Sequence, residues 1–540
     1  MSEKKNGEKS RQPSGRPGHG PGSMRNIEKA KDARGITKRL INYFEEYKLS
    51  IIFVILITVI STLVGLAAPY LIGVAIDQYI ITGDIDGLTR IIALLGGVYV
   101  FTTLASGVNS IIMARVSQGS LMKLRKHLFE HIQLLSLSFF DKRQTGDLMS
   151  RLTNDIDAIG ALLTQNVSQL VRNFLILGGI IVLMFSLNIW LTLASLIVFP
   201  IMIGLTAVVG KNARKYYRDL QKQMGGLNGV IQETIGGQQV VIVFDQQETV
   251  NRRFDERNKA VKEAGVLAMT YSMTVPPIMG ILSNANIAIV AGLGGWMTLQ
   301  GLATVGTIAT FIQYSRQFAN PLRHFANMYN SIQSALAGAE RIFEVIDTPP
   351  EVTDAEDAYD LREIKGEVRF ENVNFGYTPD IPVLKEVSLH AKPGETVALV
   401  GPTGAGKTTI VNVLTRFYDI QSGEITIDGR NINTVKKDAL RRKLGIVLQD
   451  VYLFSGTVMD NIKYGNLEAT EEECIAAAKL ANADGFIRRL PKGYQTELSE
   501  RAGNLSQGQK QLLSIARAII ANPAILILDE ATSSVDTRTE

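Results

Sequence analysis

The chain is 540 residues long, which exceeds the size of a single ordinary hydrophobic core and predicts two or more domains. Only 20% of its residues are charged and its mean hydropathy is positive, at +0.11, which excludes an ordinary large soluble protein and indicates that part of the chain lies in lipid. The net charge of +4 gives no reason to expect a nucleic-acid partner, and a single cysteine excludes an internal disulfide and an all-cysteine metal site.

Residues 1–35 are rich in Lys, Arg, Gly and Pro and have almost no apolar content, so we expect a disordered tail. This tail has no apolar stretch and is therefore not a cleaved signal peptide. The next segment, ITKRLINYFEEYK, predicts an interfacial helix with its apolar residues on one face. These residues are Ile36, Leu40, Ile41 and Phe44.

Four stretches without any charged residue are each longer than the roughly 20 residues needed to cross the hydrocarbon core. The first two predict one spanning helix each. The last two are longer and contain turn-like residues, at 186–188 and 299–306, so each predicts a helical hairpin and the total is six spans. The four stretches are residues 49–76, 91–114, 173–210 and 264–315.

The loops between these spans differ in charge. Residues 115–157 carry seven Lys or Arg residues and residues 211–263 carry ten, whereas the alternate loops carry only Arg90. By the positive-inside rule the long basic loops, the N-terminus and everything after the sixth span are predicted to be cytoplasmic. The periodicity of these loops predicts that the spans continue into the cytoplasm as long helical stalks.

Arg172 is the one charged residue that the pattern places at membrane depth. It lies roughly 21 Å below the outer end of the third span if that span ends near Ser186. One interpretation makes it a substrate or gating contact. The other, which the residues alone favour, is that it snorkels or faces a water-filled interior.

A soluble domain is predicted to follow a linker rich in Pro and acidic residues. Residues 366–377 alternate as strands do, and a strand predicted at 395–400 leads into GPTGAGKTT, which fits the P-loop pattern because a helix, IVNVLTRFY, follows it. In such a loop glycines and successive backbone N–H groups surround phosphate. Lys407 is expected to reach the β- and γ-phosphates of ATP, and Thr408 to bind Mg²⁺. The phosphate-binding residues are Gly401, Pro402, Thr403, Gly404, Ala405, Gly406, Lys407, Thr408 and Thr409.

An acidic pair follows the apolar stretch 524–528, which predicts a buried strand near the centre of a parallel sheet. Asp529 is the expected second Mg²⁺ ligand, and Glu530 is the expected catalytic residue that polarises the attacking water. An acidic strand end is weak evidence alone, but its pairing with a P-loop 120 residues upstream makes it specific.

The segment NLSQGQKQLLSIARAIIANP, residues 504–523, resembles the signature motif of ATP-binding cassette (ABC) proteins. The resemblance implies that Ser506, Gly508 and Gln509 contact ATP held by a partner cassette. It further implies that Tyr377 stacks on adenine, that Gln449 is the Q-loop residue near Mg²⁺ and the reaction, and that Asp536 belongs to the D-loop.

The resemblance covers residues 36 to 540 and is to half-transporters among the ABC exporters. Segments 139–157 and 233–254 are similar to the intracellular segments that carry the coupling helices of these exporters. The implied fold is an all-α six-helix transmembrane domain with long cytoplasmic helical extensions, followed by an α/β P-loop cassette. The expected division is a tail at 1–35, a transmembrane domain at 36–340, a linker at 341–365 and a cassette at 366–540.

Two features depart from the family pattern. Gln507 replaces the first glycine of the usual Leu-Ser-Gly-Gly-Gln signature, which resembles one half of a bacterial heterodimeric exporter; drift in a homodimer is the alternative. No histidine follows His390, so the switch histidine expected beyond the D-loop is missing, and the resemblance implies a cassette truncated at its C-terminus.

Three function classes can be compared. A soluble cassette ATPase of DNA repair is excluded by the uncharged spans, and a membrane protein that binds ATP without hydrolysing it remains the alternative. We expect an ATP-driven exporter or flippase in the bacterial inner membrane, working by alternating access in a dimer. Because the spans contain almost no acidic residue, a small hydrophobic or amphipathic substrate is favoured over a cation.

Overall fold

The computed structural model describes residues 32–351, 354, 357–361, 364–378, 380–499 and 502–529. The chain divides into two compact units, and each is described by itself. The first comprises Met1–Glu130 and Met149–Asp347, and the second His131–Leu148 and Thr348–Glu540. The predicted disordered tail lies almost entirely outside the described residues.

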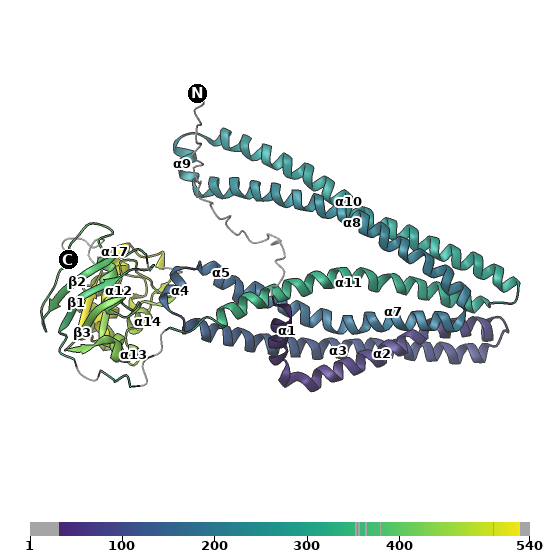
Figure 1. Ribbon diagram of the computed structural model, residues 1–540, viewed down its shortest axis with the longest axis horizontal. Coiled ribbons are helices and arrows are strands. Elements are labelled where there is room, and N and C mark those ends of the chain that lie inside the picture. The colour runs from purple at the N-terminus through teal and green to yellow at the C-terminus, as the bar shows by residue number, and fades with distance from the viewer. Residues whose placement is uncertain are drawn as a thin grey trace, which may run out of the picture. The chain divides into compact units, whose positions relative to one another are not determined.

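The first unit is wholly helical in its described part (Figure 1). Its elements are α1 (Ala33–Asn42), α2 (Lys48–Val74) with a π-helical continuation η2 (Ala75–Ile80), α3 (Ile85–Gln133), the π-helical turns η3 (Arg151–Asp155) and η4 (Leu162–Asn166) around α6 (Ile156–Ala161), α7 (Val167–Leu187), α8 (Ile189–Gly236), α9 (Gln238–Val243), α10 (Gln247–Leu299) and α11 (Val305–Ile346). The short helix α5 (Thr145–Ser150) crosses the boundary between the two units.

Five helical stretches among the described residues are long and apolar enough to cross a membrane. The prediction of six spans is therefore not confirmed, because α11 is not among them. The turn at residues 300–304 leaves only the start of α11 within the uncharged stretch, which ends before Arg316. The five stretches are Glu45–Ile80, Ile85–Gln133, Thr145–Leu187, Ile189–Gly236 and Gln247–Leu299.

Both predicted hairpin turns are confirmed, and each is fixed by a helix cap. Asn188 separates α7 from α8, and its side chain accepts a hydrogen bond from the Leu191 N–H at 3.1 Å. Thr304 separates α10 from α11 and accepts from the Thr307 N–H at 3.1 Å. Such caps satisfy N–H groups that the first helical turn leaves without a partner.

The helices run well past the apolar stretches, as predicted, since α3, α8 and α10 contain 49, 48 and 53 residues. Figure 1 shows α8 and α10 side by side along their length, joined at one end by α9. Tyr216 and Tyr271 stack between these two helices with ring centroids 4.7 Å apart. The predicted coupling segment 233–254 thus forms the α9 end of a continuous helical pair.

Helices α2, α7, α8, α10 and α11 share a core that includes Leu66, Met184 and Phe311. The buried Tyr314 donates a hydrogen bond to the Leu66 carbonyl at 2.8 Å, which links α11 to α2. At the other end of α11, Arg39 of α1 binds Asp347 through two hydrogen bonds of 2.6 and 2.8 Å. The predicted interfacial helix α1 is therefore fixed to the end of α11.

The second unit contains a four-stranded antiparallel sheet and two smaller sheets. The large sheet has the order β2-β1-β3-β4, with β1 (Val368–Phe375), β2 (Leu384–Ala391), β3 (Ser422–Ile427) and β4 (Arg430–Asn431). The parallel pair joins β5 (Leu444–Val447) to β8 (Ile525–Leu528), and the third sheet joins β6 (Gly456–Thr457) to β7 (Glu497–Leu498). The helices are α4 (Leu137–Asp141), α12 (Lys407–Leu414), α13 (Lys437–Arg442), α14 (Val458–Lys463), α15 (Glu471–Leu480), α16 (Asp484–Ile487) and α17 (Gln507–Ile520).

Two strand predictions in this unit are wrong in part. Residues 395–400 form no strand, and Val397 and Val400 are 45% and 94% exposed, because this segment pairs with no other described strand. The strand β8 does form, but its described pairing is with β5 alone, and Leu526 and Leu528 are 47% and 50% exposed. Both segments have residues that favour a strand, but a strand is buried only when other parts of the chain pair with it and pack on its faces.

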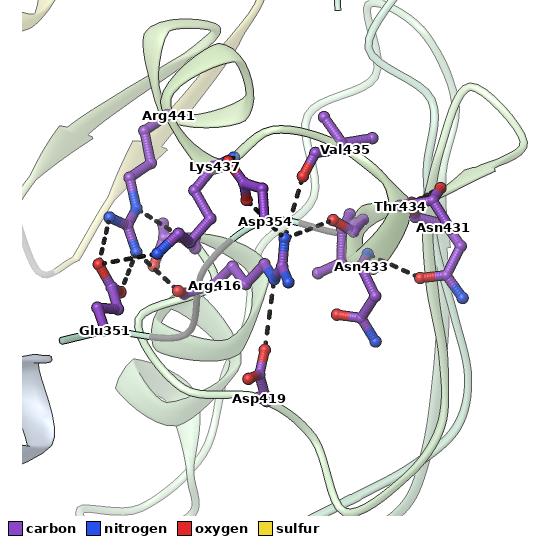
Figure 2. A network of polar contacts seen from close by, with 12 residues as sticks. Glu351, Asp354, Arg416, Asp419, Asn431, Asn433, Thr434, Val435, Lys437 and Arg441 are labelled. Atoms are coloured by element: carbon purple, nitrogen blue, oxygen red, sulfur yellow. Dashed lines mark hydrogen bonds and ion pairs between the residues drawn. The ribbon is translucent and has the colours of Figure 1, made fainter. Parts of the chain in front are cut away.

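The segment that leads into the second unit is bound to it by charge (Figure 2). Glu351 accepts hydrogen bonds from the Arg441 guanidinium at 2.6 and 3.2 Å and also pairs with Lys437. Asp354 accepts from the Lys437 N–H at the start of α13 and pairs with the buried Arg416. Residues predicted to form a linker thus include two carboxylates anchored to the cassette.

Candidate functional site

The P-loop residues surround the start of α12. Gly404 and Gly406 have φ angles of +85° and +91°, which favour glycine, and a Cβ at Gly406 would lie 3.0 Å from Leu384. Lys407, the first residue of α12, donates through its ammonium to the carbonyls of Gly401 and Pro402 at 2.7 and 3.3 Å. The loop therefore folds back around this positive charge at a helix N-terminus, which is an arrangement suited to phosphate.

The predicted pair of metal ligands lies together. The Thr408 hydroxyl donates to the Asp529 carboxylate at 2.9 Å, although the two residues are 121 positions apart. Asp529 follows β8, is 7% exposed, and its N–H donates to the Val447 carbonyl on β5 at 2.9 Å. The parallel pairing of β5 with β8 thus positions the carboxylate at the P-loop.

These residues fit a Mg²⁺ ion bound together with a nucleotide. One hydroxyl and one carboxylate supply hard oxygen ligands, and Mg²⁺ commonly takes one or two carboxylates together with phosphate oxygens. The described residues contain no cluster of three His, Cys, Asp or Glu side chains that could hold a metal without a nucleotide.

Tyr377, the predicted adenine contact, lies at the same helix. Its hydroxyl lies 3.3 Å from the Thr409 hydroxyl and accepts a hydrogen bond from the Asn412 amide at 3.0 Å. Tyr377 is 41% exposed, and its ring makes edge contacts with the rings of Phe375 and Tyr418, with centroids 5.1 and 5.0 Å away. An exposed aromatic face beside the P-loop can stack on a planar base.

Sequence reasoning did not single out Asn412 or Tyr418. Asn412 lies three residues after Thr409 on α12, so helical spacing could have placed both on one face. Tyr418 donates a hydrogen bond to Asp141 at the end of α4, within the predicted coupling segment 139–157. Burial raises the pKa of the Tyr418 hydroxyl, and the hydrogen bond to Asp141 raises it further, so this hydroxyl remains a donor at neutral pH.

The signature segment begins α17 with a capping box. The Ser506 hydroxyl accepts from the Gln509 N–H at 3.3 Å, and the Gln509 side chain accepts from the Ser506 N–H at 2.9 Å. Ser506 and Gln507 are both exposed, and Gly508 is half-buried. This helix start is therefore available to a ligand or a partner.

The structure describes the other three predicted residues only in part. Glu530 and Asp536 lie outside the described residues, so their predicted positions stay predictions. Gln449 lies in a bend two residues after β5 and is exposed. Because β5 pairs with β8, Gln449 and Asp529 follow neighbouring parallel strands at the same edge.

Two family models match the chain. One is described as the ABC transporter transmembrane region and matches residues 51–322, and the other is described as ABC transporter and matches residues 384–533. The matched segments contain the predicted spans and the P-loop, respectively.

Several known proteins are similar over most of their length. The uncharacterized ABC transporter ATP-binding protein YfiC of Bacillus subtilis is 41% identical over 512 residues, covering 95% of this chain and 85% of that protein. The fatty acid ABC transporter ATP-binding/permease protein of Mycobacterium tuberculosis is 42% identical, covering 85% and 72%. The ATP-dependent lipid A-core flippase of Syntrophus aciditrophicus is 37% identical, covering 87% and 78%.

A solved structure agrees with these matches. A bacterial Atm1-family ABC exporter with ATP bound has a TM-score of 0.72 at 30% identity, covering 91% of this chain and 87% of that one. The helical unit, the P-loop cassette and these relatives give one consistent answer: the chain belongs to the ABC transporter family, as an integral membrane half-transporter of the exporter type whose cassette hydrolyses ATP.

Proposed function

We propose that this half-transporter exports or flips a small hydrophobic or amphipathic substrate by alternating access, as one half of a heterodimer. The single observation that carries the proposal is the Thr408–Asp529 hydrogen bond, which joins the P-loop to the acidic strand end in a chain that also carries apolar spanning helices. The relatives named for fatty acids and for lipid A-core support an amphipathic substrate.

In the proposed site each residue of the chain has a separate task. Lys407 binds the β- and γ-phosphates, Thr408 and Asp529 hold Mg²⁺, with Gln449 as a further ligand, and Tyr377 stacks on adenine. Bound Mg²⁺ would neutralise charge that develops on the transferred phosphoryl group. Glu530 acts as the base that orients and polarises water.

The proposed orientation places the cassette and the N-terminus in the cytoplasm of a bacterial inner membrane. It is supported by the seventeen basic residues in the two long loops, against one in the alternate loops. We count α11 as the sixth span, because the Thr304 turn separates it from α10 and it contributes Phe311 and Tyr314 to the core of the membrane unit. Ser506, Gly508 and Gln509 contact the ATP that the partner holds, and Asp536 lies at the same dimer interface.

The test uses the chain co-purified with its partner half-transporter in lipid nanodiscs. Lys407→Ala is expected to weaken ATP binding about tenfold or more, because it removes a charged contact to phosphate. Glu530→Gln is expected to keep ATP affinity and to lower turnover at this site by about 10²–10⁴-fold, because it removes general base catalysis. Unchanged ATP affinity in the lysine variant, or unchanged turnover in the glutamine variant, would contradict the assigned roles.

A further inference from the structure

A polar cavity of about 310 Å³ lies within the helical membrane unit, between α2, α3 and the η4–α7 segment. Eight of its twelve lining side chains carry a hydroxyl, two carry an amide, and one is Met113. The remaining one is Arg172, and the lining contains no acidic residue. This polar lining contrasts with the other faces of the same helices, which carry exposed Leu, Ile and Phe side chains suited to contact with lipid.

The cavity arises from the helical spacing of polar residues in three separate helices. Thr58 and Thr62 lie one turn apart on α2, Ser106 and Ser110 one turn apart on α3, and Ser168 and Arg172 one turn apart on α7. Each helix thus presents one polar stripe, and the three stripes meet at the same cavity. Polar side chains are costly against lipid but stable where they face a cavity of their own.

Much of the hydrogen-bonding capacity of the wall is already used within the protein. The Thr58 and Thr62 hydroxyls donate to carbonyls of their own helix at 2.7 and 2.6 Å. The Asn109 amide donates to the Thr58 hydroxyl at 3.1 Å and lies 3.5 Å from the Ser168 hydroxyl, so it bridges the three helices. These contacts hold the cavity wall in place, and Arg172 is the one charged residue among the lining side chains.

Arg172 has no hydrogen bond or ion pair with any residue that the structure describes. Fifteen residues separate it from Leu187 at the end of α7, which corresponds to roughly 22 Å of helix. A guanidinium at such a depth is costly unless it has a counter-ion or water. It offers five N–H donors in a planar fork that matches a carboxylate or a phosphate.

We propose that this cavity binds the anionic head group of an amphipathic substrate, a carboxylate or a phosphate, with Arg172 as its counter-ion. The hydroxyl and amide groups around it solvate the head group, and the apolar faces of the same helices accommodate the tail. The inference rests on the proposed export function and narrows its substrate class to anionic amphiphiles. A purely cationic head group would leave the guanidinium without the negative charge that its position requires.

The test compares three amphiphiles with the same hexadecyl chain and different head groups: hexadecanoate, hexadecyl phosphate and hexadecyltrimethylammonium. Equilibrium binding of each labelled compound, below its micellar concentration, is measured for the chain with its partner in nanodiscs of zwitterionic lipid. Arg172→Gln is expected to weaken binding of the two anions about tenfold or more, and Arg172→Lys to restore part of it, since charge-assisted hydrogen bonds are among the strongest polar contacts. Binding of the cation is expected to be weak in every variant.

Arg115→Gln is the matched control, because Arg115 lies on α3 but lines a different cavity with Tyr47 and Phe53. It is expected to retain both anion binding and ATPase activity. Equal anion affinity in the wild type and in the Arg172→Gln variant would overturn the proposal and leave Arg172 as a residue that snorkels or contacts water. Equal loss in the Arg172→Gln and Arg115→Gln variants would also overturn it, since a general effect of positive charge would then explain the binding.

Two further measurements separate the source of the ligand and the underlying function. If anionic phospholipid added to the nanodisc displaces hexadecanoate, the site exists and its ligand is a lipid of the bilayer. If only free hexadecyl phosphate displaces hexadecanoate, the site exists and its ligand is a free amphiphile. ATPase activity and vesicle transport are measured in parallel. A wild-type complex that binds the anions through Arg172 but does not transport them would contradict the export function and leave the binding site intact. Transport of the anions at the same rate in the wild type and in the Arg172→Gln variant would contradict the binding site alone.

Discussion

Thr408 and Thr409 are neighbours in the sequence, but their hydroxyls contact different parts of the cassette. Thr408 binds Asp529, and Thr409 lies against the Tyr377 hydroxyl. Thr408→Ala is therefore expected to raise the Mg²⁺ concentration for half-maximal ATPase activity by about tenfold to a hundredfold, because it removes a proposed ligand. Thr409→Ala, the matched control, is expected to leave the Mg²⁺ dependence unchanged. The measurement is a Mg²⁺ titration at saturating ATP, and parallel shifts in the two variants would contradict the assignment.

The segment that enters the cassette depends on Glu351, which joins it to α13 through Arg441 and Lys437. Burial opposes ionisation of this carboxyl, but the hydrogen bond from Arg441 and the charges of Arg441 and Lys437 outweigh it, so its pKa is lower than the ordinary 4.5. A lowered pKa in the folded state stabilises this contact above about pH 4.5, and that contribution is lost as the pH falls through the folded-state value. Glu351→Gln is accordingly expected to destabilise the segment by about 1–2 kcal/mol at pH 7 and by less below pH 4.5.

The measurement for this element is the amide hydrogen-exchange protection of residues 348–361, corrected for the intrinsic effect of pH. Glu468→Gln is the control, because Glu468 is exposed and its side chain has no partner among the described residues. A difference between the wild type and the Glu351→Gln variant that stays constant from pH 7 to pH 4 would show that the charge of Glu351 does not hold this segment.

At the scale of the whole molecule, the start of α17 determines which partner the cassette suits. Gln507 is exposed beside Ser506, at the position where the family signature has a glycine, so its side chain would crowd the phosphate of a facing nucleotide. The chain purified alone is expected to have weak ATPase activity, whereas its complex with a partner that has an intact signature is expected to be active. The Gln507→Gly substitution is expected to raise the ATPase activity of the chain alone. A stable dimer of this chain with high, transport-coupled ATPase activity, unchanged by Gln507→Gly, would contradict the heterodimer proposal.

The sequence by itself determined what depends on short stretches of chain. The apolar runs predicted the five helical stretches that are long and apolar enough to span a membrane. The polar residues between them predicted the hairpin turns, and the P-loop predicted the start of α12, because each is specified by residues within a few turns. The pairing of Thr408 with Asp529 was also predictable, since two local motifs of known chemistry imply one site.

Only the tertiary structure decided what depends on residues far apart. Residues 395–400 have the pattern of a strand but pair with none, and β8 is half-exposed, because a strand is completed by partners and covering layers elsewhere in the chain. The polar cavity at Arg172 was not predictable for the same reason: its three stripes lie on three helices, and no local pattern specifies that they face each other. The sequence predicted Arg172 at membrane depth, and only the packing of α2, α3 and α7 showed that it lines a cavity.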